Sequence, residues 1–243
     1  MPDPDGSLAL YPVRGIGEVL PGDDVADLLA DLLGPGGDGP TLADGDVVVV
    51  TQKIVSKAEG RLVPVDHDDP AAKVALVEAE SVRVLRRRGD LLITETRHGF
   101  VCANAGIDLS NVAEGTAALL PVDADRSARR IRAGLGRRLG VEVGVVISDT
   151  FGRTWRQGVT DVAIGCAGVA AVLDLRGTTD ALGRELQATE ICVVDEIAGA
   201  AELVMGKDRG VPVAVVRGVP AAWLRPASVA DEVVRRKGED LFR

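Results

Sequence analysis

Polar side chains follow an apolar run at 143–147, which we predict to be a buried strand. Asp149 and Thr150 come directly after this run, and Arg153 and Arg156 follow in a glycine-rich segment that we predict to be a loop. Carboxylate and hydroxyl oxygens suit a hard cation such as Mg²⁺ or Mn²⁺, whereas arginines suit phosphate or carboxylate. For Asp149 alone the ordinary interpretation is a helix N-cap after a strand. The cluster as a whole favours a binding site.

Two further polar segments follow predicted strands. Lys57 is a candidate for binding phosphate, whereas we assign Lys53 to a solvated hairpin. Asp108 and Asn111 form either an Asx-turn or a second metal carboxylate with an amide that reads a base or ribose. Asp108, Asp149 and Lys57 lie at three separate strand ends, and phosphoryl transfer needs carboxylates for Mg²⁺ and cations for phosphate.

Composition and charge exclude several classes of protein. The net charge of −9 argues against nucleic acid as a partner, and aromatic residues make up only 2% of the chain, too few for stacking on bases. The chain has no GxxxxGK[ST] motif, and the GxG at 15–17 lacks the third glycine of a dinucleotide-binding loop. With His67 and His98 as the only histidines, a multi-histidine zinc site is excluded. No apolar run is long enough to span a membrane, and the acidic N-terminus does not resemble a signal peptide.

The three cysteines, Cys102, Cys166 and Cys192, show no CxxC spacing. Their odd number and apolar surroundings indicate reduced thiols and a cytoplasmic location. Cys102 and Cys166 lie beside the polar motifs, but no accompanying His–Asp or His–Asn pattern supports a nucleophile.

The predicted elements define an α+β fold class, because strands and helices alternate only loosely between long polar segments. We predict helices at 24–33, 69–88, 125–139 and 195–205, strands at 46–50, 91–93, 143–147, 190–194 and 213–216, and a helical tail from Ser228. The 243 residues, of which 46% are hydrophobic, suffice for a single domain spanning 1–243 or for two interleaved subdomains.

Five long motifs, in order along nearly the whole chain, resemble the coenzyme F420-0:L-glutamate ligase (F420:gamma-glutamyl ligase) family. They are TQKIVSKAEGR, ITETRHGFVCANAGIDLSNV, LLPVDADRSARRIRAGL, VVISDTFGRTWRQGVTDVAIGCAG and ELVMGKDRGVPVAVVRG. The resemblance implies an unusual mixed sheet and helix fold in an intimate homodimer. It also implies a GTP-dependent and divalent-metal-dependent ligase that adds L-glutamate to F420-0 and then extends the tail by γ-linkage.

The resemblance also implies site residues. The nucleotide-binding positions are Ile16, Gly17, Glu18, Val19, Gln52, Lys57, Asn111, Met205, Gly206, Lys207 and Asp208, and the metal positions are Asp108, Asp149 and Thr150. Two Mg²⁺ or Mn²⁺ ions are expected, with K⁺ as a further candidate cation and GTP as co-substrate. Some relatives have serine in place of Gln52, and others have a metal-binding glutamine in place of Lys207, which cannot replace that ligand.

These features together predict acyl-phosphate chemistry, with Arg153 and Arg156 holding substrate carboxylates or the phosphodiester, and with Asp161 or Glu95 as candidate bases. The alternatives are a non-catalytic protein that binds nucleotide or deazaflavin, and an amide ligase for a different acceptor. Mycobacterial-type relatives carry an additional C-terminal reductase domain, and we expect none in this sequence.

Overall fold

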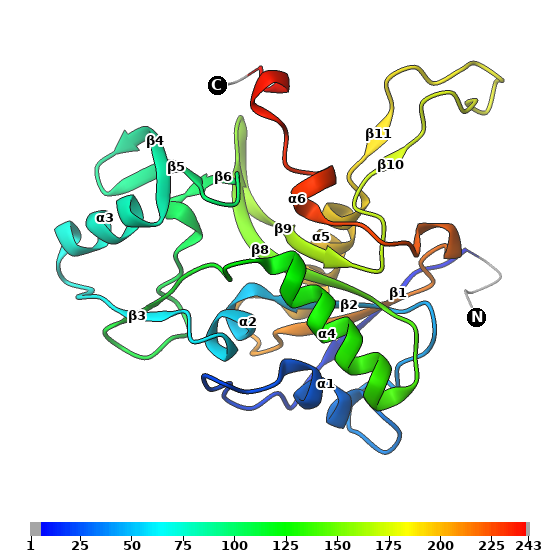
Figure 1. The fold of residues 1–243 in the computed structure, drawn as a ribbon, viewed down its shortest axis with the longest axis horizontal. Helices are drawn as coiled ribbons and strands as arrows, with labels where there is room; N and C mark the ends of the chain where they lie inside the picture. Colours follow the sequence, from blue (N-terminus) through cyan, green and yellow to red (C-terminus); the bar gives the residue numbers. More distant parts are fainter. Residues whose placement is uncertain (1–5, 242–243) are drawn as a thin grey trace.

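The structure, a computed structural model, describes residues 6–241 and is built around a five-stranded mixed sheet (Figure 1). The strands lie in the order β1 (Ala9–Val13), β12 (Val213–Arg217), β2 (Val47–Thr51), β8 (Gly144–Arg153) and β9 (Arg156–Ala167). β2 and β8 are parallel, and all other neighbours are antiparallel. The valine-rich run of β2 and the apolar half of β8 form the buried centre, as expected for parallel strands covered on both faces.

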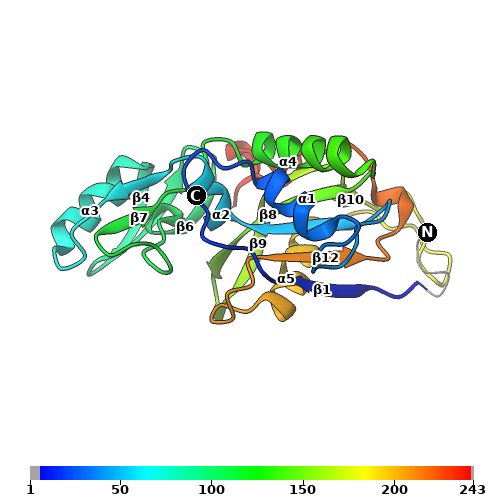
Figure 2. The same ribbon diagram turned by 90° about the horizontal axis from the view of Figure 1, so that it is seen from below.

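Helices cover both faces of this sheet (Figure 2). On one face, α1 (Val25–Leu33) and α4 (Ala124–Leu139) pack against alternate strand residues such as Val48 and Ile147. On the other face, α5 (Val193–Met205) and the short α6 (Val229–Glu232) pack against Val49, Val146 and their neighbours. Because successive side chains of a strand point to opposite faces, each central strand contributes to both cores.

A smaller region lies beyond the end of the main sheet at which β2 stops (Figure 1). It contains α2 (Gln52–Ala58), α3 (Pro70–Ala79), the antiparallel pair of β3 (Leu62–Pro64) and β7 (Thr116–Ala118), and a three-stranded sheet of β4 (Ser81–Arg88), β5 (Leu91–Thr96) and β6 (Val101–Ala103). A projecting arm carries the short strands β10 (Leu173–Asp174) and β11 (Glu190–Ile191). The α+β class is therefore confirmed.

The predicted helix at 69–88 is wrong in its second half. The cap at Asp69 and the N1 proline are correct, since Asp69 accepts a hydrogen bond from the N–H of Ala71. The helix ends at Ala79, however, and the arginine-rich residues form β4, which pairs with β5 through a turn at Gly89 (φ +59°). Pairing with β5 decided this conformation, and the terminal arginines line a mostly exposed strand rather than a helix end.

Three other boundaries also differ from the prediction. β8 continues past Ser148 to Arg153, because β9 pairs with it along that whole length, so Asp149 is a strand residue and not an N-cap. β11 ends at Ile191 and α5 already begins at Val193. The helical tail is reduced to α6 and a single 3₁₀ turn, Lys237–Glu239. Residues 1–5, part of the segment judged unlike a signal peptide, and residues 242–243 lie outside the described part.

Among the helices of residues 6–241, none combines the length and the apolar character needed to cross a bilayer.

Candidate functional site

A cavity of about 810 Å³ opens where β2 ends and β8 continues beyond it, paired with β9 alone. Parallel strands bring their carboxyl ends to one edge of a sheet, and ligands commonly bind outside that edge. Thr51 and Ser148, which are paired across the two strands, both line the cavity. The 105–111 segment and the loop after α5 complete the walls, so chain segments distant in sequence converge here.

Helix α2 begins directly after β2 and forms one wall of the cavity. Gln52, only 1% exposed, donates from Nε2 to Ser56 Oγ (2.7 Å) and to the carbonyl oxygen of Leu119 (3.0 Å). Lys57 is also buried, and its Nζ lies 2.6 Å from Oε1 of the exposed Glu18. A nearly buried ammonium that faces the cavity is suited to an anionic ligand.

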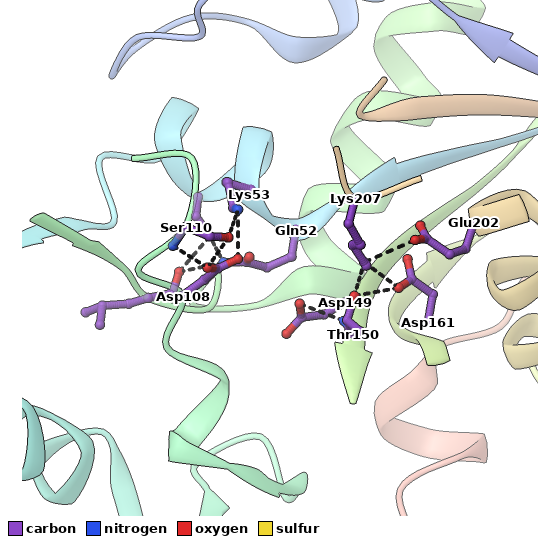
Figure 3. A network of polar contacts seen from close by, with 11 residues as sticks. Gln52, Lys53, Asp108, Ser110, Asp149, Thr150, Asp161, Glu202 and Lys207 are labelled. Carbon is purple, nitrogen blue, oxygen red and sulfur yellow. Dashed lines mark hydrogen bonds and ion pairs between the residues drawn. The ribbon is translucent and has the colours of Figure 1, made fainter. Parts of the chain in front are cut away.

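Asp108 lies on the same side of the cavity, held by three donors (Figure 3). Its Oδ1 accepts from the N–H and the hydroxyl of Ser110, both at 2.7 Å, and its Oδ2 lies 2.8 Å from Nζ of Lys53. Burial opposes ionisation, but the Lys53 ammonium and the Ser110 donors outweigh it and lower the pKa of Asp108. The Asx-turn therefore exists, and it fixes the carboxylate inside the cavity. The prediction that Lys53 lies in a solvated hairpin is wrong, because the residues after β2 form helix α2, and Lys53 lines the cavity.

Asp149 projects from β8 into the cavity (Figure 3). Burial raises its pKa to about 7, against the hydrogen bond that Oδ1 accepts from the N–H of Thr150 (2.8 Å). The negative charges of Asp108 and Asp161 raise this pKa further. A carboxylate that is desolvated among other carboxylates is stabilised when a cation binds beside it.

A second polar cluster joins β8, β9 and the loop after α5. Asp161, 1% exposed, accepts hydrogen bonds from Ser148 Oγ (3.0 Å) and Thr150 Oγ1 (2.6 Å). Lys207 Nζ lies 2.8 Å from Asp161 Oδ1, contacts Thr150 Oγ1, and lies 3.6 Å from Glu202 Oε1. Sequence reasoning missed Glu202. One feature of the sequence could have indicated its role. Glu202 lies in the last turn of α5, where the helix dipole disfavours an acidic side chain, so a carboxylate at this position suggests a function other than helix stability.

The structure brings most of the predicted residues to this cavity. Those that line it are Ile16, Glu18, Gln52, Lys57, Asp108, Asn111, Asp149, Thr150, Asp161, Gly206, Lys207 and Asp208. Gly17 does not line the cavity, while Val19 and Met205 are buried in the cores.

Arg153 and Arg156 are exposed at the tip of the β8–β9 hairpin and do not line the cavity either. They flank the turn in a strand pair, not in the loop that we expected, because β8 and β9 continue to pair up to these two residues.

Other candidates lie outside the cavity. Glu95 is buried, and its Oε2 lies 2.7 Å from Nε of Arg83 in an ion pair. Cys102 is buried, and burial raises its pKa to about 12, as it does for Cys166. Such thiols are not nucleophiles at neutral pH. The ring of His98 bonds through Nε2 to the carbonyl oxygen of Pro121 (2.9 Å), which is a structural contact.

The donor set fits Mg²⁺ or Mn²⁺, since the groups that face the cavity are carboxylate and hydroxyl oxygens. In residues 6–241, no three His, Cys, Asp or Glu side chains are close enough to form a metal cage. This agrees with an ion held by one or two carboxylates and completed by substrate oxygens, as is usual for Mg²⁺ in phosphate-handling enzymes. Asp149 and Asp108 are the residues that would hold it, whereas the hydroxyl of Thr150, the third predicted metal position, is in contact with Lys207.

The cavity at the carboxyl ends of the parallel strands is lined by carboxylates, three lysines and a buried amide, which are groups suited to anionic ligands together with cations. Comparison with known proteins identifies the family. A sequence profile described as F420-0:Gamma-glutamyl ligase matches residues 15–218. The chain belongs to this family.

Three relatives match over most of their length. The coenzyme F420:L-glutamate ligase of Methanothermobacter thermautotrophicus is 42% identical, over 97% of this chain and 99% of the relative. Its counterpart in Methanopyrus kandleri is 41% identical over 98% of each chain, and that in Methanocaldococcus jannaschii is 36% identical over 83% of this chain and 86% of the relative.

Proposed function

We propose that this protein is a GTP-dependent and divalent-metal-dependent ligase that joins the amino group of L-glutamate to the terminal carboxylate of coenzyme F420-0. Family membership supports the ligase activity and its two substrates. The observation that carries the proposal is the convergence of Asp108, Asp149 and Lys57, from three distant segments, in one cavity of nucleotide size.

The proposed reaction has two steps. A carboxylate oxygen of F420-0 attacks the γ-phosphorus of GTP, and the bond to the β–γ bridging oxygen breaks, so that GDP leaves and an acyl phosphate forms. The glutamate amine then attacks the acyl carbon, the C–O bond to phosphate breaks, and the amine releases one proton to water. The products are the amide, GDP and phosphate. The divalent ion supplies neutralisation of charge on the phosphate oxygens.

The residues of this chain prepare both steps. Lys57 offers a buried ammonium to the phosphates, and the hydrogen bonds of Gln52 to Ser56 and Leu119 anchor the start of α2 beside it. Asn111, at a positive φ of 53°, lies on the cavity wall, and in this proposal its amide reads the nucleotide. Asp161 is occupied by three donors, which argues against its role as the base for the amine.

The active unit in this proposal is a homodimer. Exposed apolar side chains lie on two elements, with Trp155 (83% exposed) and Val159 on the β8–β9 hairpin and Val82, Val84 and Val101 on the small sheet. Such side chains are suited to a contact with a second chain. Since Arg153 and Arg156 lie outside the cavity of their own chain, their proposed role in holding substrate carboxylates depends on a second chain.

Mass spectrometry of reactions containing F420-0, L-glutamate, GTP and Mn²⁺ tests the proposal. We expect a product heavier by one glutamate residue, with stoichiometric GDP. A ladder of such increments would show that the γ-carboxylate of the new glutamate is used in turn. Absence of any glutamate adduct, with GTP intact, would refute the ligase assignment, and adducts on other carboxylic acids only would point to a different acceptor.

A further inference from the structure

The side chain of Lys207 extends from the loop after α5 into the polar cluster on β8 and β9 (Figure 3). Three oxygen atoms lie around its Nζ. They are the hydroxyl of Thr150, Oδ1 of Asp161 at 2.8 Å and Oε1 of Glu202 at 3.6 Å. These are the ligand types that Mg²⁺ and Mn²⁺ prefer. The ammonium therefore occupies a position whose surroundings match those of a hard cation.

This position requires positive charge. Asp161 is 1% exposed, and a buried carboxylate without a cation partner is strongly destabilising. The pKa of Glu202 is raised by burial and by the charge of Asp161, and Lys207 counteracts this rise. The cluster thus contains more negative charge than its own hydroxyl donors compensate.

A lysine can supply this charge but cannot act as a metal ligand. Its ammonium carries three N–H donors and no acceptor, so it repels a metal ion that approaches Thr150 and Asp161. Glycine at 206 (φ +66°) ends α5 and turns the chain toward the cavity, which brings Lys207 over these oxygens.

We propose that the ammonium of Lys207 replaces one of two divalent ions, so that this protein binds a single ion, at Asp149 and Asp108, and uses the lysine as a tethered cation at Thr150 and Asp161. The inference rests on the proposed function, because it concerns the cations of that same reaction. The ammonium lies in the cavity with Asp149 and is placed to meet the phosphate oxygens of the bound nucleotide.

The number of bound Mn²⁺ ions tests this inference without an activity measurement. Crystals of the wild type, Lys207→Gln and Lys207→Arg are soaked in Mn²⁺, and anomalous difference density locates each ion. Titration calorimetry with Mn²⁺ gives the stoichiometry in solution, which covers a variant that does not crystallise. Lys73→Gln is the matched control, since it removes a lysine from α3 at the far end of the molecule (Figure 1).

We expect one ion per chain in the wild type, in Lys207→Arg and in Lys73→Gln. Lys207→Gln, which replaces the ammonium with an amide oxygen, should bind a second ion between Thr150 and Asp161. Two ions in the wild type, one ion in Lys207→Gln, or a second ion in Lys73→Gln would each overturn the inference but leave the ligase proposal standing. No ion in any variant would overturn both the inference and the metal requirement. The expected counts without glutamate adducts would support the inference and refute the ligase.

Discussion

Nζ of Lys53 lies 2.8 Å from Oδ2 of Asp108, so the carboxylate that we assign to a metal ion is neutralised by a lysine when no ion is bound. Both groups are largely shielded from solvent, which strengthens their attraction. A divalent ion that bound at Asp108 would therefore displace the Lys53 ammonium or share the Asp108 carboxylate with it.

Removal of the Lys53 ammonium should strengthen metal binding. We expect Lys53→Met to lower the Kd for Mn²⁺ by about tenfold, equivalent to ~1.4 kcal/mol, because the ion no longer competes with the Lys53 ammonium for the Asp108 carboxylate. Isothermal titration calorimetry on the nucleotide-free protein measures this change. Weaker Mn²⁺ binding in Lys53→Met would show instead that the lysine orients Asp108 for the metal.

Asp149 should be indispensable to turnover but not to folding. Asp149→Asn removes one negative charge from the proposed metal site, and we expect kcat to fall by roughly a hundredfold or more. The melting temperature should be kept or raised in the absence of metal, since burial already disfavours the ionised form. Near-normal turnover with intact Mn²⁺ dependence would rule out Asp149 as a ligand.

The nucleotide site should discriminate between bases. We expect GTP to be preferred strongly over ATP, because a site built to hydrogen-bond one base leaves buried groups unpaired with the other. Asn111→Ala should reduce that preference more than it reduces kcat with GTP. Steady-state rates with each nucleotide decide the matter, and equal rates with ATP in the wild type would contradict the GTP assignment.

The arginines of the hairpin offer a test of the dimer. Arg156→Lys keeps the charge but loses the planar fork, so we expect a higher KM for F420-0 or glutamate and an unchanged KM for GTP. If the hairpin of one chain serves the cavity of the other, mixing inactive Asp149→Asn with a weak Arg156→Ala chain should restore part of the activity. No recovery after subunit exchange, with dimers confirmed by light scattering, would place the arginines outside the reaction.

The thiols should be inert in the native protein. Burial raises the pKa of both Cys102 and Cys166 to about 12, so their thiolate fraction at pH 8 is very small. We expect slow alkylation by iodoacetamide in the folded state and rapid alkylation of all three cysteines in guanidinium chloride. Fast labelling of native Cys102 would contradict this prediction and make Cys102 a candidate nucleophile again.

The sequence by itself determined the elements whose signals are local. The cap at Asp69, the amphipathic pattern of α4 and the valine run of β2 each specify an element without help from distant residues. The long motifs likewise led to the family and to most of the residues that line the cavity. Hydrophobic periodicity and capping act over one or two turns, which a linear chain displays directly.

Only the tertiary structure decided how the polar groups are paired. β4 is a strand because β5 pairs with it, and β8 carries Asp149 as a strand residue because β9 extends the pairing beyond the core. The contacts of Lys53 with Asp108 and of Lys207 with Asp161 join residues separated by dozens of positions. Charge compensation depends on distance and burial in three dimensions, and neither quantity has a local signature in the sequence.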